Sequence, residues 1–278
     1  MCIAFFYLAP EKDDSGPVAL ILVMNRDEDL RRPTEPARWL GHDPPILAGR
    51  DLTEGREGGT WLGLEKRTGK LAFLTNMYTG EALNPQAHGR GHLVTDFLNS
   101  PQSGTDYLNG IFRTDKLFNP FNLVTMDWDG YAGRYQAQYF RPTQAPNSLC
   151  SGFHGLSNHP YTQPFLKTER GLSQFQSLVA EAQDGKRDRK ALVEALITML
   201  HQKERHVPDE QMKRQAGPDA EPHDCLGSIF VESPNGEYGT RAQTVIIVNK
   251  NGKVYFQERA RSAEEDWSSH EFEFTIGE

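Results

Sequence analysis

A cysteine at position 2 is the first residue of this chain whose position favours chemistry. A small residue after Met1 commonly allows removal of the initiator, which would leave Cys2 with both a thiol and a free α-amine. An α-amine has a reference pKa of about 8 and can act as the general base for a neighbouring nucleophile. Free cysteine is also among the most buried residue types, so a core position is the alternative interpretation.

Four consecutive polar residues, Asn25-Arg26-Asp27-Glu28, follow an apolar run from Val18 to Met24. The apolar run predicts a strand, and the polar residues predict its end at a sheet edge near Cys2. An arginine there could hold a thiolate, and an aspartate could hydrogen-bond the α-amine. A solvated turn held by local charge pairs is the alternative.

Two asparagines and an arginine complete the polar candidates. Asn76 follows a predicted strand and Asn158 closes a Gly-Leu-Ser-Asn segment, so either side-chain amide could donate to an oxyanion. Taken singly, such asparagines are more often turn or cap residues. Arg241 stands at the start of an apolar strand.

The nine histidines do not predict a metal site. His88 and His92 are four residues apart, and His201 and His206 five, but neither pair has a third ligand in view. His154 and His159 bracket the Gly-Leu-Ser-Asn segment and are the candidate axial ligands for a haem.

Hydrophobic periodicity supplies the elements that must position these residues. It predicts helices at 91–99 and 105–112 and a second pair around 172–179 and 192–200. Strands are predicted at 1–8, 17–24, 60–65, 70–76, 121–128, 131–140, 148–157, 226–232, 241–249, 253–259 and 271–276. Strands and helix pairs in this order favour an α+β fold with antiparallel sheets. We expect one domain, residues 1–278, with a surface loop at 202–224 that is rich in charge and proline.

Composition excludes several classes of protein. The chain has 278 residues, a formal net charge of -8 and three cysteines. Its longest apolar run has seven residues, far short of the roughly 20 that span a membrane, so no transmembrane segment is predicted. An acidic balance without a basic block argues against nucleic acid as a partner. Three scattered cysteines indicate a reducing compartment rather than a disulfide framework.

The ordered set of short motifs resembles the NRDE family, which includes the transport and Golgi organisation protein 2 homologues. The resemblance spans essentially the whole chain. It is carried by Met1-Cys2-Ile3, Asn25-Arg26-Asp27-Glu28, Gly49-Arg50-Asp51, Gly58-Gly59-Thr60-Trp61-Leu62-Gly63, Leu74-Thr75-Asn76, Gly89-Arg90-Gly91, Gly155-Leu156-Ser157-Asn158, Tyr238-Gly239-Thr240-Arg241 and Glu258-Arg259.

This resemblance implies an N-terminal-nucleophile (Ntn) hydrolase-like fold, a four-layer αββα sandwich. In related amidases a cysteine after the initiator is the nucleophile. The catalytic roles of those amidases fall here on Cys2, Asn25, Asp27, Asn76, Asn158 and Arg241, and Arg26 is a further candidate catalytic residue. The arginine that precedes the asparagine in those amidases corresponds to Met24 here, and Arg26 falls between the asparagine and the aspartate.

Two functions follow from the resemblance. The first is a haem-trafficking protein that binds haem, acyl-CoA or another lipid-like metabolite in the Ntn-type cleft, linked to Golgi and ER organisation and to mitochondrial lipid homeostasis. The alternative is a Cys2-dependent hydrolase of amides or thioesters, which requires a free Cys2 amine. No catalytic metal is expected in either. The expected location is the cytoplasm, with mitochondrial and Golgi-associated pools.

Overall fold

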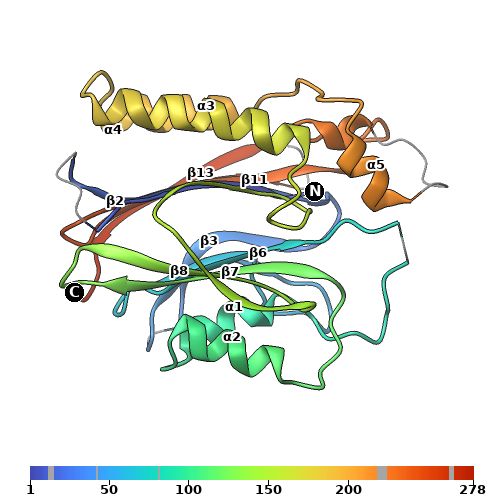
Figure 1. The fold of residues 1–278 in the computed structure, drawn as a ribbon, viewed down its shortest axis with the longest axis horizontal. Coiled ribbons are helices and arrows are strands. Elements are labelled where there is room, and N and C mark those ends of the chain that lie inside the picture. Colours follow the sequence, from blue (N-terminus) through green and yellow to red (C-terminus); the bar gives the residue numbers. More distant parts are fainter. Residues whose placement is uncertain (12–15, 42, 81, 218–223, 263–265) are drawn as a thin grey trace.

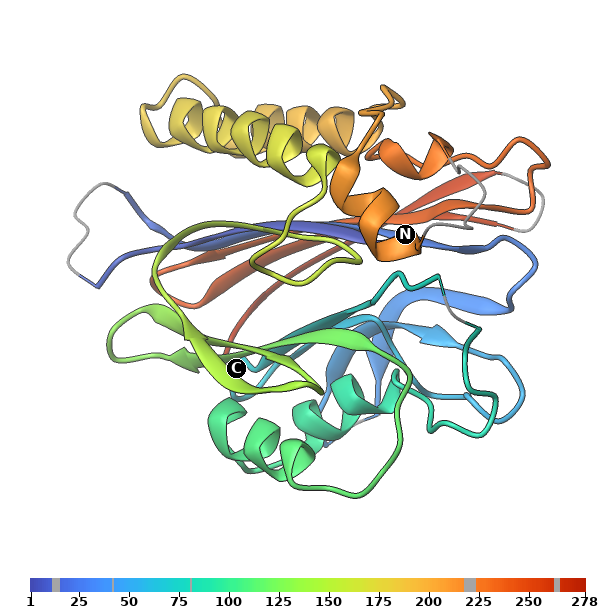
Figure 2. The same cartoon turned by 45° about the vertical axis from the view of Figure 1, so that its right-hand side comes forward.

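Two antiparallel sheets lie face to face, with helices on the outer face of each (Figures 1 and 2). The computed structural model describes residues 1–11, 16–41, 43–80, 82–217, 224–262 and 266–278. From top to bottom of Figure 1 the order of the layers is helices, sheet, sheet, helices. This layer order confirms the predicted α+β sandwich.

The first sheet has six strands in the order β10-β1-β2-β11-β12-β13. Its central strands β1, β2 and β11 are buried along most of their length, because helices cover one face and the second sheet covers the other. The strands are β1 (Ile3–Leu8), β2 (Val18–Asp29), β10 (Gly152–Leu156), β11 (Tyr238–Asn249), β12 (Lys253–Arg261) and β13 (Trp267–Thr275).

The second sheet has seven strands, β3 to β9, and each pairs with its neighbour along the chain. Antiparallel neighbours can be joined by short connections, but the connection from β6 to β7 is long and carries two helices. The strands are β3 (Thr34–Leu40), β4 (Ile46–Asp51), β5 (Leu62–Glu65), β6 (Leu71–Asn76), β7 (Phe121–Asp129), β8 (Arg134–Arg141) and β9 (Gln144–Leu149).

Two helix pairs form the outer layers. The first sheet carries α3 (Leu166–Gln183) and α4 (Arg189–Leu200), and the second carries α1 (His92–Asn99) and α2 (Gly104–Phe112). All four were predicted. A short helix α5 (Glu210–Ala216) and a 3-10 turn η1 (Asp224–Gly227) lie near the N-terminus. No helix in the described part of the chain is long and apolar enough to cross a membrane.

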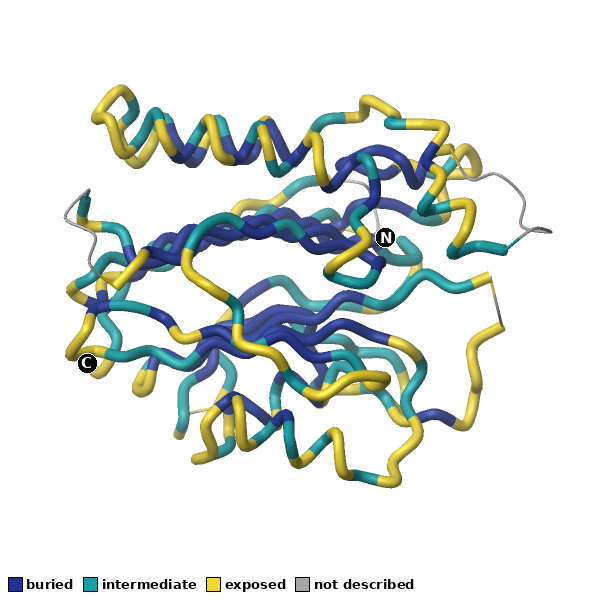
Figure 3. Tube along the Cα trace, in the orientation of Figure 1, coloured by how far each residue is buried: buried dark blue, intermediate teal, exposed yellow. Residues whose placement is uncertain are grey.

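Strand alternation divides the core into layers. Ala4, Phe6 and Leu8 of β1 point between the sheets, whereas Phe5 and Tyr7 point to the helices α3 and α4. A third cluster packs the second sheet against α1 and α2. Figure 3 shows the resulting pattern, with buried residues along the central strands of both sheets. The period of two in a strand thus builds both interfaces of the first sheet.

The predicted strand at 148–157 is wrong as one element. Its first part belongs to β9 in the second sheet and its last part to β10 in the first. The chain passes between the sheets at residues 150–151, and Gly152 has a φ of 117°, which favours glycine. This crossing brings Ser157 and Asn158 beside Cys2.

The predicted surface loop at 202–224 is also wrong in part. Residues 210–216 form α5, whose N-cap Asp209 accepts a hydrogen bond from the Met212 N–H at 3.0 Å. The helix has too few apolar residues to show a periodic pattern, and it is held by Met212, which packs beside Met1. Residues 218–223 of the predicted loop lie outside the described residues.

The apolar segment predicted as a strand at 226–232 is irregular. It is buried, but its main-chain groups find other partners: Phe230 N–H donates to the Gln202 carbonyl, and Val231 N–H donates to the Thr240 hydroxyl. Only Glu232 forms a bridge, to Gly239. Burial explains the apolar composition, and the absence of a continuous partner strand explains the irregular backbone.

Replacing Asn122 by alanine is expected to destabilise the crossing segment strongly. The buried Asn122 amide donates to the Ser157 and His159 carbonyls at 3.1 and 2.9 Å, and its oxygen accepts from the Tyr139 hydroxyl at 2.7 Å. Loss of the amide leaves two buried carbonyls without this donor, so we expect unfolding free energy to fall by about 2 to 4 kcal/mol in urea titration. Tyr139→Phe removes the hydroxyl that donates to Asn122 and accepts from the Tyr161 N–H at 3.3 Å, but it keeps both bonds from the Asn122 amide to the crossing segment, and is the milder control. Equal losses would contradict this assignment.

Candidate active site

A cavity of about 350 Å³ opens where the start of β1 and the end of β2 meet the loops around β5 and β6. Its wall combines a thiol, carboxylates and several guanidinium groups with a smaller apolar surface. The polar lining includes Cys2, Arg26, Asp27, Glu28, Arg32, Asp51, Arg56, Asn76 and Arg90, and the apolar lining includes Trp61, Leu74 and Leu83.

The segment Asn25-Arg26-Asp27-Glu28 was predicted to follow the strand that ends at Met24. In the structure it forms part of that strand, β2. The strand pairs with β1 through Ile3 and Asn25 and with β11 through Asp27 and Thr240. Strand alternation sends Arg26 to the inter-sheet side, and Asn25 and Asp27 to the other. The first three of these polar residues are buried, which excludes the solvated-turn interpretation.

Cys2 and Arg26 face the same cavity. Cys2 is 7% exposed, and its Sγ lies 3.7 Å from the Asp27 carbonyl oxygen. The Arg26 guanidinium lies 4.0 Å from the centre of the Trp61 ring and donates to the Thr34 hydroxyl at 3.1 Å. Burial raises the pKa of the Cys2 thiol, and the N-terminal amine and Arg26 oppose that shift. Arg26 therefore supplies positive charge on the thiol's side of the sheet, while Met24 is buried in the core.

The amine of residue 1 occupies a buried polar site next to Cys2. It donates to the Tyr238 hydroxyl at 2.5 Å and lies 3.2 Å from the Asp27 carboxylate. The Thr240 hydroxyl donates to the other Asp27 oxygen at 2.7 Å. Burial lowers the pKa of this amine and so favours its neutral form, whereas the attraction of Asp27 favours the charged form.

The Met1 side chain fills an apolar pocket beside this amine. It is 4% exposed and packs with Phe165, Cys225, Leu226 and Val231. Lys167 is also fully buried nearby and donates to the Ser228 carbonyl at 3.1 Å. Burial lowers the pKa of Lys167, while Asp27 and Cys2 favour its charged form.

The two predicted amide donors lie in different environments. Asn76 lines the cavity. The Asn158 amide instead donates to the Asn76 carbonyl, and the Asn158 carbonyl accepts from Tyr78 N–H. Beside it the Ser157 hydroxyl donates to the Cys2 carbonyl at 2.7 Å. Asn158 thus positions the end of β6 and the residues around Cys2.

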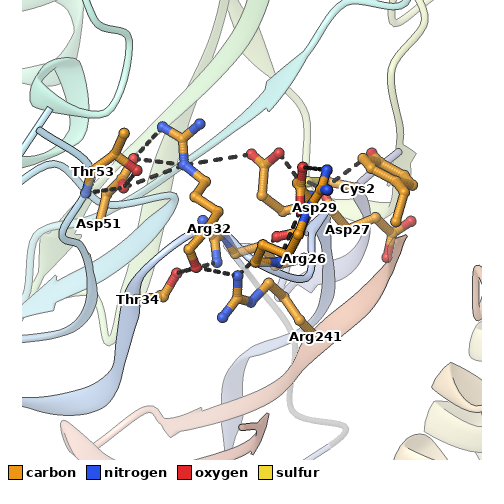
Figure 4. Close-up of polar contacts among 12 residues, drawn as sticks. Cys2, Arg26, Asp27, Asp29, Arg32, Thr34, Asp51, Thr53 and Arg241 are labelled. Carbon is orange, nitrogen blue, oxygen red and sulfur yellow. Dashed lines mark hydrogen bonds and ion pairs between the residues drawn. The ribbon is translucent and has the colours of Figure 1, made fainter. Parts of the chain in front are cut away.

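Asn25 and Arg241 hold neighbouring backbone. The Asn25 amide donates to the Leu200 and Ile229 carbonyls at 2.7 and 3.0 Å, which ties β2 to the end of α4. Arg241 lies at a register shift of β11 and turns away from the ladder to donate to the Asp29 and Arg32 carbonyls (Figure 4). Neither residue lines the cavity that contains Cys2.

Both candidate haem ligands are engaged inside the protein. The two ring nitrogens of His154 lie 2.6 Å from the Tyr161 hydroxyl and 2.9 Å from the Cys150 carbonyl. His159 bonds the Pro160 carbonyl and the Thr168 hydroxyl, and burial lowers its pKa to about 4. Neither histidine fits an axial ligand, since neither has a free ring nitrogen. Among the described residues, no group of three or more His, Cys, Asp or Glu side chains is arranged to hold a metal.

The sequence interpretation missed the remaining guanidiniums of the cavity. Arg32 is paired with Asp51, which also accepts from Thr53, as Figure 4 shows. In the part of the chain that the structure describes, neither Arg56 nor Arg90 has such a carboxylate partner. The motif Gly89-Arg90-Gly91 was noted for its resemblance alone, although glycines around an arginine are a signal for close backbone packing.

Glu258 is buried close enough to Arg26 to interact with its charge, and it predicts a pH dependence of the protein's stability. It accepts from the Ala37 N–H at 2.6 Å, but burial raises its pKa from 4.5 to about 7. The folded state therefore binds this proton more tightly than the unfolded chain, so stability falls as the pH rises from about 4.5 through about 7. Urea midpoints at about pH 5 and about pH 8 should differ less in Glu258→Gln than in the unchanged protein; an equal pH dependence in both would contradict this.

Comparison with known proteins places these features in a family. Residues 1–263 match the family described as Transport and Golgi organisation 2. The Transport and Golgi organization protein 2 homolog of Homo sapiens is 36% identical over 280 residues, 99% of each chain. Its Bos taurus counterpart is 37% identical over 98% of this chain and 99% of its own, and the Drosophila melanogaster protein is 30% identical over 93% and 91%. The chain belongs to the Transport and Golgi organisation 2 family.

Proposed function

We propose that the protein is a hydrolase of linear amides or thioesters, with Cys2 as the nucleophile once Met1 is removed. The observation that carries the proposal is the pairing of a cavity-lining thiol with a buried amine site. Asp27, Tyr238 and Thr240 form that site, and in the chain that keeps Met1 the first two contact the Met1 amine. The proposal requires that the Cys2 amine takes this position once Met1 is removed. The resemblance to Ntn amidases, in which one residue supplies nucleophile and base, agrees with it.

The proposed reaction uses the Cys2 amine as base. Cys2 Sγ attacks the substrate carbonyl carbon while its proton passes to the α-amine, and the Asn76 amide donates to the resulting oxyanion. Cleavage of the C–N or C–S bond leaves an acyl thioester on Cys2, and the ammonium returns the proton to the leaving group. Water then attacks the thioester, which releases a carboxylic acid and restores the thiol.

Burial favours the neutral thiol–amine pair over the thiolate–ammonium pair. It raises the pKa of the thiol and lowers that of the residue-1 amine. Proton transfer is therefore expected to accompany attack rather than precede it. With Met1 attached, Cys2 has no α-amine of its own, so the chain carrying Met1 is inactive in this proposal.

Intact-mass spectrometry of protein isolated from its own cell tests the proposal directly. We expect the mass of a chain that begins at Cys2. Brief incubation with a panel of short-chain acyl thioesters should then add one acyl mass, located on Cys2 by peptide mapping. A population that keeps Met1, or acylation elsewhere only, would contradict the hydrolase.

A carrier that binds haem or another amphipathic metabolite, such as an acyl-CoA, is the second candidate. The cavity supports it by combining an apolar wall of Trp61, Leu74 and Leu83 with guanidiniums that suit carboxylates or phosphates. Since His154 and His159 do not fit, iron ligation by them is not part of this proposal. Titration should give saturable binding without turnover; a linear Soret change on haem addition would exclude a specific haem site.

The names of the relatives refer to transport and Golgi organisation, so we also propose a cytoplasmic protein with mitochondrial and Golgi-associated pools. Fractionation of cells that express the tagged protein, with a tag at the C-terminus to leave Cys2 free, tests this location. Recovery from one compartment alone would contradict the distribution.

A further inference from the structure

We propose that Arg56 and Arg90 form an anion subsite of the cavity, which holds a phosphate or carboxylate of the same molecule whose carbonyl reaches Cys2. The substrate class is then an anionic amide or thioester. The link to a reacting carbonyl rests on the proposed hydrolase, whereas anion binding by the two arginines does not depend on it.

Close backbone packing places Arg90 in the cavity wall. Gly59 and Gly91 are so near that a Cβ on Gly91 would lie 3.0 Å from the Gly59 Cα, and Thr60 N–H donates to the Gly91 carbonyl at 3.2 Å. This contact fixes the loop that carries Arg90 against the start of β5. The guanidinium donates to the Pro120 carbonyl at 2.9 Å, which holds it while leaving further N–H groups for a ligand.

Arg56 is held beside Arg90 by a glycine and a carbonyl. Its guanidinium donates to the Ala87 carbonyl at 3.3 Å, and a Cβ on Gly89 would lie 2.7 Å from its Nη1. Only a residue without a side chain allows this approach. Two glycines of one short segment therefore position the two arginines. Gly89 leaves room for the Arg56 guanidinium, and Gly91 lets the loop that carries Arg90 pack against Gly59.

Among the described residues, no carboxylate forms an ion pair with the guanidinium of Arg56 or Arg90. In the described ranges, every ion pair at the cavity involves other residues: Arg32 pairs with Asp51 and Glu28, and Asp27 pairs with the amine. The surroundings of Arg90 also disfavour its charged form. Burial, Arg32 and Arg56 lower its pKa to about 10, although the attraction of Glu28 opposes this shift. A bound anion would relieve this excess of positive charge.

The start of α1 adds to the same field. Gly91 and His92 line the cavity, and α1 has neither a side-chain cap nor an acidic residue in its first turn. The positive end of the α1 dipole is therefore not offset by a cap or an acidic side chain of its own first turn, and it adds positive potential to the cavity. Planar guanidiniums beside it match the paired oxygens of a carboxylate or a phosphate.

Isothermal titration of the full chain with inorganic phosphate, and separately with succinate, tests the subsite. Arg56→Gln and Arg90→Gln should each weaken binding by roughly tenfold or more, while the exposed Arg170→Gln should leave it unchanged. The preferred ligand of the two assigns the anion. No binding by the unchanged protein, or equal affinity in all variants, would overturn the proposal.

Gly89→Ala provides a second test that keeps both guanidiniums. The new methyl group displaces the flexible end of Arg56 rather than backbone, so the far-ultraviolet circular dichroism should be unchanged while anion affinity falls. Retained affinity in this variant, with Arg56 displaced, would contradict the geometry. Because binding is measured without turnover, failure of the subsite and failure of the hydrolase give different results.

Discussion

Cys2→Ala is expected to lose hydrolysis by roughly 10⁴-fold or more while remaining folded. No other described thiol lines the cavity, and Asn76 and Arg26 cannot form an acyl intermediate. Unfolding free energy should change by only about 1 kcal/mol, since the thiol makes one weak contact at 3.7 Å and alanine fits the same strand position. Kinetics with an acyl thioester, beside urea titration, separates the two effects.

Cys150→Ala is the matched control because Cys150 is exposed and lies outside the cavity. It should retain full activity. The rate of the unchanged enzyme should rise with pH as the Cys2 α-amine, whose reference pKa is about 8, loses its proton and becomes the neutral base. Hydrolysis that survives in Cys2→Ala would exclude the N-terminal mechanism, whatever the pH profile.

Much of the fold could be predicted because its long elements have clear periodicity. The helices α1, α2 and α4 and the strands β1, β7 and β12 agree with the prediction within three residues, whereas α3 begins six residues before and ends four residues after the predicted stretch. Strand β3 was missed because it lies at a sheet edge, contains Pro36 and has a register shift between Glu35 and Arg38. Most of its residues are half-buried and only Ala37 is buried, so the strand lacks the alternation of buried and exposed residues.

The site was predicted in part, for a related physical reason. Polar residues after an apolar run usually end a strand, yet Asn25 and Asp27 continue β2 because each has buried partners on other segments. Those partners, Leu200 and Thr240, are distant in sequence. Composition cannot reveal such pairs. Nor can it distinguish Asn76, which lines the cavity, from Asn158, whose side-chain amide donates to the Asn76 carbonyl.

Asp27→Asn is expected to cost about 3 to 5 kcal/mol of unfolding free energy, because it removes the buried carboxylate that favours the charged forms of the residue-1 amine and of Lys167. The amine lies 3.2 Å from the carboxylate, and Asp27 is the strongest influence favouring the charged form of Lys167. Thr240→Val removes one hydrogen bond to the same carboxylate and should cost only about 1 to 2 kcal/mol. Urea titration of both variants gives the comparison.

A double-mutant cycle with Lys167→Met identifies the cause of that loss. If the penalty is an uncompensated buried charge, removing Lys167 as well should recover part of it, so the double variant loses less than the two single variants combined. If Asp27 acts only through its hydrogen bond from Thr240, the two losses add. Additivity would therefore contradict the electrostatic role, whereas coupling would show that the anion beside Cys2 also holds a buried lysine of α3 in place.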